Sequence, residues 1–559
     1  MGAGVPMMSR FLKTRRLIQE WIIPGEEEKI SYLTRRYLYT ELTLIIIFVS
    51  ISLFAWKLSI ESLLMILMGT YLVSLYYRFY YTRKKYMSLL LQFEQFLVSV
   101  RNIYQNTGMV EEALQESIWE TEEEISSHMQ QLFMALELED SEELQEFKEG
   151  ISFPYILTFY ILCKTCITYG DSYTDGKSAF LSNMNHLKEE IHNEVLRRRR
   201  LNHVFSGLLF VTVFPILFID FIRIWSIGNL PELIKYYDGG YGLIVKFILC
   251  VITLITFRLI QYLMEPKELV KRPHFYLEKL CNINIIKQFL IEHIHKREEK
   301  WQKVYRDLVS ISSSYTVPQF LFLKISLAAC SLIITSIVMI FMVIRENSVS
   351  FITTSLLYTE QEITVAARDT NYLMIFFCII LITIISYYIP NIQLIIKLAC
   401  GNRDVEDELM RLQAVLIMLT PIRRMTVETL LEWLAYASEI FLPVINEGMD
   451  CFLQDNEKSL DIMYQSCNND SFRHLIKNLE VSDRIGICHA FEEVPGDYSY
   501  NIEKRKQDNE IRTDNQGSIG KFIAFFPMVL LIGGYLIVPF ILESISQFMT
   551  YVTQMQGLS

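Results

Sequence analysis

Residues 83–118 read RKKYMSLLLQFEQFLVSVRNIYQNTGMVEEALQESI and open the charged block around which the chain is organised. From Leu89 to Val100, apolar residues recur at three- and four-residue spacing, which predicts a helix with one buried face. Asn106-Thr107-Gly108 interrupts the pattern, and either of the first two residues is the expected N-cap of the next helix. Strand signals are scarce as far as residue 202, so we expect an all-helical block.

A second block of similar length, at residues 399–521, lies in the same setting: two apolar segments precede it and one follows. Sliding the chain by 316 residues aligns Glu112 with Glu428 and Gly170 with Gly486, and it aligns the predicted helix breaks. Few residues are identical at this offset, so the shared spacing and the shared flanking segments indicate a diverged internal duplication. We expect two homologous helical-bundle domains.

The composition requires the chain to alternate between lipid and water. Of its 559 residues 51% are apolar and 13% aromatic, yet 21% are charged. Seven segments have about the 20 apolar residues that cross a hydrocarbon core: Leu38–Trp56, Leu58–Tyr77, Phe205–Phe221, Leu243–Met264, Phe320–Ile344, Tyr372–Leu398 and Phe522–Leu542. One bent helix is the alternative for the first pair, but Lys57 and Glu61 favour a turn at the membrane interface.

Lys and Arg are distributed unevenly between the loops. They gather before the first span, after the second, in the run Arg197–Arg200 and throughout 265–319, whereas 229–241 and 346–371 hold few. This bias predicts a cytoplasmic N-terminus, two cytoplasmic helical domains and a C-terminus outside. The predicted order is a cytoplasmic N-terminal segment (1–37), a membrane hairpin (38–80), helical domain one (81–202), spans three and four (203–264), a cytoplasmic linker (265–319), spans five and six (320–398), helical domain two (399–521), span seven (522–544) and an outside tail (545–559).

The residues favour no enzymatic chemistry. Gly170–Ser178 resembles a phosphate-binding loop, but it has five residues between the glycines instead of four and follows a predicted helix. Cys163 and Cys166 have redox spacing inside an apolar helix, which favours core cysteines. We therefore expect no catalytic residue, cofactor or metal. The net charge of −11 argues against nucleic-acid binding.

Gly108-Met-Val-Glu-Glu-Ala-Leu114 follows an apolar helix, and a Gly170-Asp171 turn leads to the basic exit helix Glu190–Arg200. With the membrane hairpin before it, this order resembles the type II secretion F family, the inner-membrane platform proteins of type II secretion, type IV pili and Tad (Flp) pili. Met425–Leu430 and Ile485-Gly486 stand in the corresponding places of the second copy. Because each copy begins with a hairpin, the chain resembles two Tad-type subunits fused.

The resemblance implies a non-enzymatic scaffold in the bacterial inner membrane that couples a cytoplasmic hexameric ATPase to pilin or pseudopilin subunits. Membrane lipid and further copies of the chain are the other expected partners. A transporter or channel subunit is the alternative, disfavoured because ionisable residues lie near the span ends, and a membrane sensor is a third.

Two sets of residues are candidates for this function. Charged residues at the start of each second helix are candidate ATPase contacts, although solvated surface is the favoured interpretation of each one taken singly: Glu111, Glu112, Glu116, Arg423, Arg424 and Glu428. Pro215 and Pro527 are predicted to kink the spans that follow the two exit helices. A push on either exit helix would then reach a bent span.

Overall fold

The computed structural model describes residues 27–55, 60–121, 123–137, 154–174, 176–264, 284–296, 298–310, 315–356, 372–400, 403–422, 425–452, 456–467 and 469–556, together with 11–12, 14–15, 18–19 and 281. Nearly all of these residues are helical. Within them, the strands are β1 (Tyr173–Thr174) and β2 (Lys177–Ser178), which pair as one antiparallel hairpin. The prediction of an all-helical fold is therefore confirmed apart from this short hairpin.

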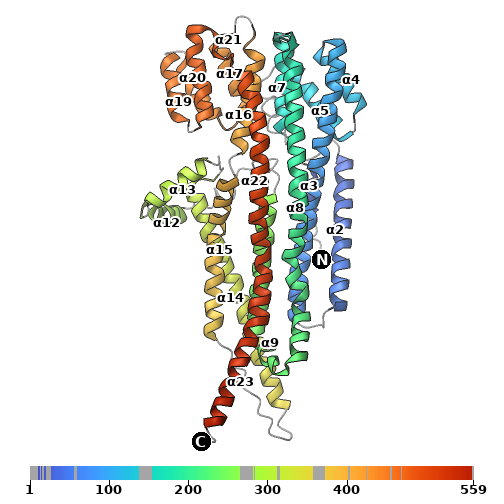
Figure 1. The fold of residues 1–559 in the computed structure, drawn as a ribbon, viewed down its shortest axis with the longest axis vertical. Helices are drawn as coiled ribbons and strands as arrows, with labels where there is room; N and C mark the ends of the chain where they lie inside the picture. The colour runs from blue at the N-terminus through green and yellow to red at the C-terminus, as the bar shows by residue number, and fades with distance from the viewer. Residues whose placement is uncertain are drawn as a thin grey trace.

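The molecule is long, with most of its short helices gathered at one end (Figure 1). Three helices, α3 (Ile60–Thr107), α8 (Ala179–Asn229) and α22 (Val494–Leu530), run from this end into the rest of the molecule. We call the end itself the head. It contains the adjoining parts of these helices with α4 (Val110–Glu120), α5 (Glu123–Glu137), α7 (Pro154–Tyr169), α16 (Arg403–Leu419), α17 (Val427–Ala437), α18 (Leu442–Phe452), α19 (Asn456–Ser466), α20 (Asp470–Ile485) and α21 (Ile487–Ala490).

Below the head lie longer, more apolar helices. They are α2 (Glu27–Ala55), α10 (Gly240–Met264), α14 (Val317–Leu356) and α15 (Tyr372–Cys400), accompanied by η1 (Pro231–Leu233), α9 (Ile234–Tyr237), α12 (Asn284–His295), α13 (Glu298–Ser310), the π-helix η2 (Leu531–Ile537) and α23 (Val538–Gln556). Helix α10 packs against both α8 and α22, and the buried Leu249, Phe257 and Ile260 belong to the core below the head. Helices α8, α10 and α22 are thus packed together below the head.

Five helices among the described residues are long and apolar enough to cross a membrane: Glu27–Leu53, Ala179–Asn229, Tyr241–Met264, Val317–Ile337 and Ile487–Gln556. The other two predicted spans fall in α3 and α15, where Ile379–Ile395 is a shorter apolar helix. Helices α2 and α3 pack side by side as separate helices, so this pair is a hairpin and not one bent helix. The chain has several helices suited to a membrane.

The predicted breaks in the head are confirmed. Helices α3, α7 and α20 end immediately before Gly108, Gly170 and Gly486, whose φ angles are 69°, 80° and 86°. Glycine adopts this left-handed backbone without the steric cost that a side chain brings. Helices α7 and α20 are both 16 residues long, so the two blocks also match in this helix, although β1 and β2 follow α7 and α21 follows α20 before the exit helix begins.

Two predicted helix starts differ from the structure. Asn106 and Thr107 do not cap α4, because α3 remains helical through Thr107 and Met109 occupies the N-cap position without a side-chain hydrogen bond. For the second exit helix the sequence pattern predicts a start near Tyr500, but α22 begins at Val494, since Pro495 fits the first turn, where its missing N–H costs nothing.

Candidate functional site

The two blocks share one hydrophobic core. Leu114 and Phe159 of the first block and Leu416 and Leu431 of the second belong to the same cluster of buried side chains. Helix α7 packs against α16 and α17, and on that contact the indole Nε1 of Trp433 donates to the Tyr169 hydroxyl at 3.2 Å. The predicted separate domains therefore form a single head.

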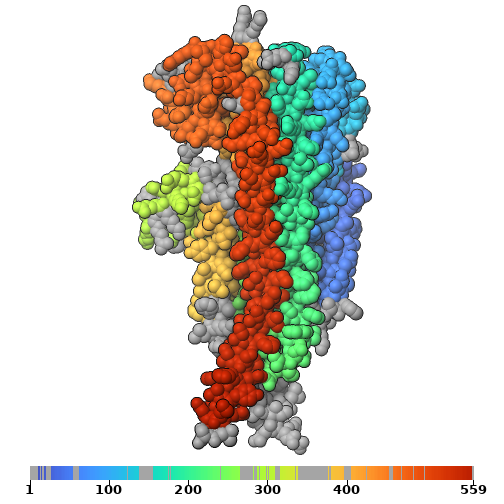
Figure 2. All heavy atoms as spheres, viewed as in Figure 1, coloured from blue at the N-terminus to red at the C-terminus, as the bar shows by residue number. Residues whose placement is uncertain are grey.

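The exit helices α8 and α22 lie side by side and run in the same direction (Figures 1 and 2). Arg505 contacts Glu190, 315 positions earlier in the chain, and Arg200 pairs with Asp514, 314 positions later. Lower down, a Cβ added at Gly520 would overlap the ring of Phe205, so the absence of a side chain lets the backbones approach. The residues in these contacts are thus 314 or 315 positions apart in sequence, within two residues of the 316-residue offset that aligns the blocks.

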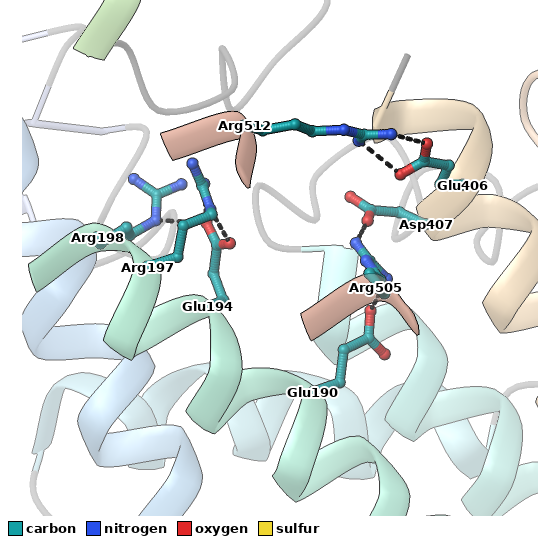
Figure 3. Close-up of polar contacts among 8 residues, drawn as sticks. All are labelled: Glu190, Glu194, Arg197, Arg198, Glu406, Asp407, Arg505 and Arg512. Carbon is teal, nitrogen blue, oxygen red and sulfur yellow. Dashed lines mark hydrogen bonds and ion pairs between the residues drawn. The ribbon is translucent and has the colours of Figure 1, made fainter. Parts of the chain in front are cut away.

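An ion-pair network joins these helices to α16 (Figure 3). The Arg505 guanidinium donates to Glu190 of α8 at 2.8 Å and also pairs with Asp407 of α16. Arg512, two helical turns further along α22, makes a bidentate contact with Glu406 at 2.9 and 2.6 Å. We call Glu190, Asp407, Glu406, Arg505 and Arg512 the exit-helix clamp. It ties three helices from both blocks at the point where the head meets the helices below it.

The neighbouring part of α8 has its own network. Glu194 accepts from the Nε atoms of Arg197 and Arg198, each at 2.7 Å, and the Arg198 guanidinium lies 4.0 Å from the ring centroid of Tyr86 on α3. The basic run that the sequence places before the third span is therefore partly neutralised by one carboxylate. These contacts join α3 to α8 beside the clamp.

The part of the clamp around Arg505 is largely removed from water. Side chains of Glu190, Asp407 and Arg505 are between 14% and 18% exposed, and a small hollow lined by Tyr155, Glu190 and Arg505 lies beside them. Burial raises the pKa of Glu190 above its ordinary value of 4.5, although the Arg505 charge opposes this shift. Burial also raises the pKa of the Tyr155 hydroxyl well above 10, so that side chain stays neutral. Because isolated buried charges are costly, Arg505 is the group that keeps two carboxylates in place.

The predicted contact residues are not brought into one patch. Glu111, Glu112 and Glu116 lie on the exposed face of α4, and Glu428 is exposed in the first turn of α17. These helices occupy different flanks of the head (Figure 1). Arg423 and Arg424 lie outside the described residues. Three of the candidate contact residues therefore form an acidic surface on α4, and Glu428 lies apart from this surface, on α17.

Both predicted kink residues lie inside helices. Pro215 is buried within α8, which continues without interruption to Asn229. Pro527 is near the end of α22 and is followed by the π-helix η2, which contains Gly533 and Gly534. A π-helix changes the hydrogen-bond ladder locally, so α22 passes through an irregular segment below Pro527 while α8 does not.

The cysteine pair and the segment that resembles a phosphate-binding loop both lie in or next to α7. Cys163 and Cys166 are buried in α7, and burial raises the pKa of the Cys166 thiol to about 11. The segment Gly170–Ser178 forms the β1–β2 hairpin after α7, and Ser178 accepts from the Leu181 N–H as N-cap of α8. Among the residues that the structure describes, no group of three or more His, Cys, Asp or Glu side chains could hold a metal.

One feature of the sequence could have predicted the clamp. At the 316-residue offset, Glu189 and Glu190 align with Arg505 and Lys506, so equivalent positions of the two exit helices carry opposite charges. Such inversion is expected where two copies of one helix face each other. Comparisons with protein-family models, curated proteins and solved structures find no match.

Proposed function

We propose that this chain is a non-enzymatic membrane platform of a type II secretion or type IV/Tad pilus-like assembly machine. In this role, the head faces the cytoplasm and receives an assembly ATPase, and the membrane helices contact pilin or pseudopilin subunits. The observation that carries the proposal is the pair of parallel exit helices, which leave a single head and continue into apolar segments without a linker.

The geometry suits mechanical coupling more than chemistry. Helices α8 and α22 are 51 and 37 residues long, or roughly 75 and 55 Å at 1.5 Å per residue. A load applied to the head therefore travels along a continuous hydrogen-bonded rod instead of a flexible loop. The clamp at Arg505 makes both rods move with α16, so the two blocks respond as one body.

The α4 flank supports the docking half of the proposal. Glu111, Glu112 and Glu116 are exposed on a short helix whose other face, including Ala113 and Leu114, is fully buried. Exposed ion pairs each contribute only about 0–1 kcal/mol, which suits a contact that must form and release. A basic surface on the ATPase is the complementary partner.

Deletion of the chain in its own cell tests this function. We expect extracellular filaments, or the secreted substrate, to disappear while the cellular amount of pilin-like subunits is unchanged. Complementation with the wild-type chain should restore them, and Arg505→Met should restore less at equal membrane abundance. Unchanged filaments and unchanged secretion after deletion would contradict the proposal.

A further inference from the structure

The last helix continues well past the predicted seventh span. That span was expected to end at Leu542, yet α23 runs from Val538 to Gln556. Its 19 residues correspond to roughly 28 Å of helix at 1.5 Å per residue. Figure 1 shows α23 extending away from the head beyond the neighbouring helices that carry labels.

One side of α23 is attached to its own chain. Glu543, which is 6% exposed in its side chain, accepts from the Lys235 ammonium of α9 at 2.5 Å. One turn further, the Gln547 amide donates to Glu232 of η1. These two contacts anchor the helix through the face that carries residues 543 and 547.

The opposite side carries an apolar seam at heptad spacing. Steps of three and four residues connect its members, which we call the C-terminal seam: Val538, Ile541, Ile545, Phe548, Val552 and Met555. Phe548 is 66% exposed and Met555 74% exposed, so the chain itself does not cover this stripe. If Val538, Ile545 and Val552 are assigned to position a, Glu543 and Thr550 fall at position f, opposite the seam. The anchored face and the uncovered face are therefore distinct.

We propose that the C-terminal seam pairs in parallel with the same seam of a second copy of this chain. β-Branched residues occupy every a position, as in parallel two-stranded coiled coils. Glu543 is the sole acidic or basic side chain in residues 538–559, and it is paired with Lys235, so identical helices meet without charge repulsion. In a parallel pair of identical helices, each seam residue lies opposite the same residue of the second copy.

The parallel orientation rests on the proposed membrane placement, because copies inserted alike present α23 on the same side and at the same depth. The part beyond Leu542 then lies in water, where burial of Ile545, Phe548 and Met555 is favourable. A lipid surface is the less suitable occupant. Helices that lie on membranes typically use Lys or Arg on the polar face, and α23 has neither.

Cysteine cross-linking in native membranes tests this pairing. Phe548→Cys places a thiol on the seam, whereas Thr550→Cys places one on the opposite face of the same turn. Oxidation should link Phe548→Cys into dimers about tenfold more than Thr550→Cys, since side chains at positions a and d meet across a parallel pair and those at position f do not. The unsubstituted chain reports background from native cysteines such as Cys488 and Cys330.

Equal linking at both positions, or no linking at Phe548→Cys, would overturn the proposal. A thiol at 548 that neither links nor reacts with a water-soluble maleimide would assign the seam to lipid and overturn it as well. The assay needs neither ATPase nor filament. A failure of cross-linking would therefore contradict the seam pairing without contradicting the platform function. Cross-linking at Phe548→Cys in cells that make no filament would support the pairing even where the platform function fails.

Discussion

The Arg505 guanidinium of α22 lies 2.8 Å from the Glu190 carboxylate of α8, although 315 residues separate them in sequence. This separation is one residue short of the offset that aligns the two blocks. The two exit helices thus meet at nearly equivalent positions of the two blocks. The contact therefore supports the duplication more strongly than the few identities between the blocks do.

The clamp predicts unequal effects for its two partners. Arg505→Met leaves Glu190 and Asp407 near each other without their cation, and we expect a loss of about 3 kcal/mol in the free energy of unfolding. Glu190→Gln should cost less than about 1 kcal/mol, because Arg505 keeps Asp407. Thermal unfolding of the purified chain in detergent measures both. Equal losses would show that the clamp does not depend on the cation.

The pH dependence of stability follows from Glu190. Burial raises its folded pKa above the unfolded value, so the protonated form favours folding. Its contribution is fully present below about pH 4.5 and is lost as the pH rises through the folded pKa. Removing the Arg505 charge raises that pKa further. The stability deficit of Arg505→Met relative to wild type should therefore shrink as the pH falls from 7 to about 5, and a deficit independent of pH would contradict this cause.

The close approach of the exit helices predicts a steric effect at Gly520. Gly520→Ala places a methyl group against the fully buried ring of Phe205, and we expect a loss of about 1–3 kcal/mol. Gly207→Ala is the matched control, since nothing lies near its added Cβ and alanine favours a helix by about 0.5–1 kcal/mol. Unfolding curves should separate the two variants in opposite directions. Equal stability would place the helices further apart than the structure has them.

Reporter fusions test the predicted topology. A fusion after Ser559 should be active outside the cell membrane, whereas fusions near Glu142 and Asn469 should report the cytoplasm, as the Lys and Arg distribution indicates. A cytoplasmic C-terminus would mean an even number of spans. The discrepancy would then be sought first in α3 and next in α15, because neither is among the five described helices that are long and apolar enough to cross a membrane.

The local features were predictable from sequence, and the long-range ones were not. Apolar periodicity and glycine breaks located the ends of α3, α7 and α20, because these signals act within one or two helical turns. The continuity of α8 from the head into the third span was also predicted and is confirmed. The predicted N-cap of α4 was wrong, because a residue type that favours capping does not show whether the preceding helix continues through it.

The shared core and the exit-helix clamp depend on which helices meet in space. Periodicity shows that Leu416 and Leu114 face inward, but it cannot show that they face the same interior. Arg505 and Asp407 look like solvated charges in the sequence, since each is surrounded by other charged residues. Only the charge inversion at the repeat offset pointed to a pairing, and it pointed to the contact between Arg505 and Glu190. The sequence pattern did not predict that α23 extends to Gln556. Its apolar seam directly follows the predicted span, so no break in the pattern marks it as a separate helical segment.

Recovery of the partner ATPase with the purified chain tests the proposed platform function. Wild-type chain and the triple variant Glu111→Lys, Glu112→Lys, Glu116→Lys are isolated from native membranes at equal abundance, and the bound assembly ATPase is quantified. We predict that wild type recovers a hexameric ATPase and that the variant recovers much less. Absence of any assembly ATPase with wild type would contradict the platform function, and equal recovery with both would contradict docking on the α4 flank.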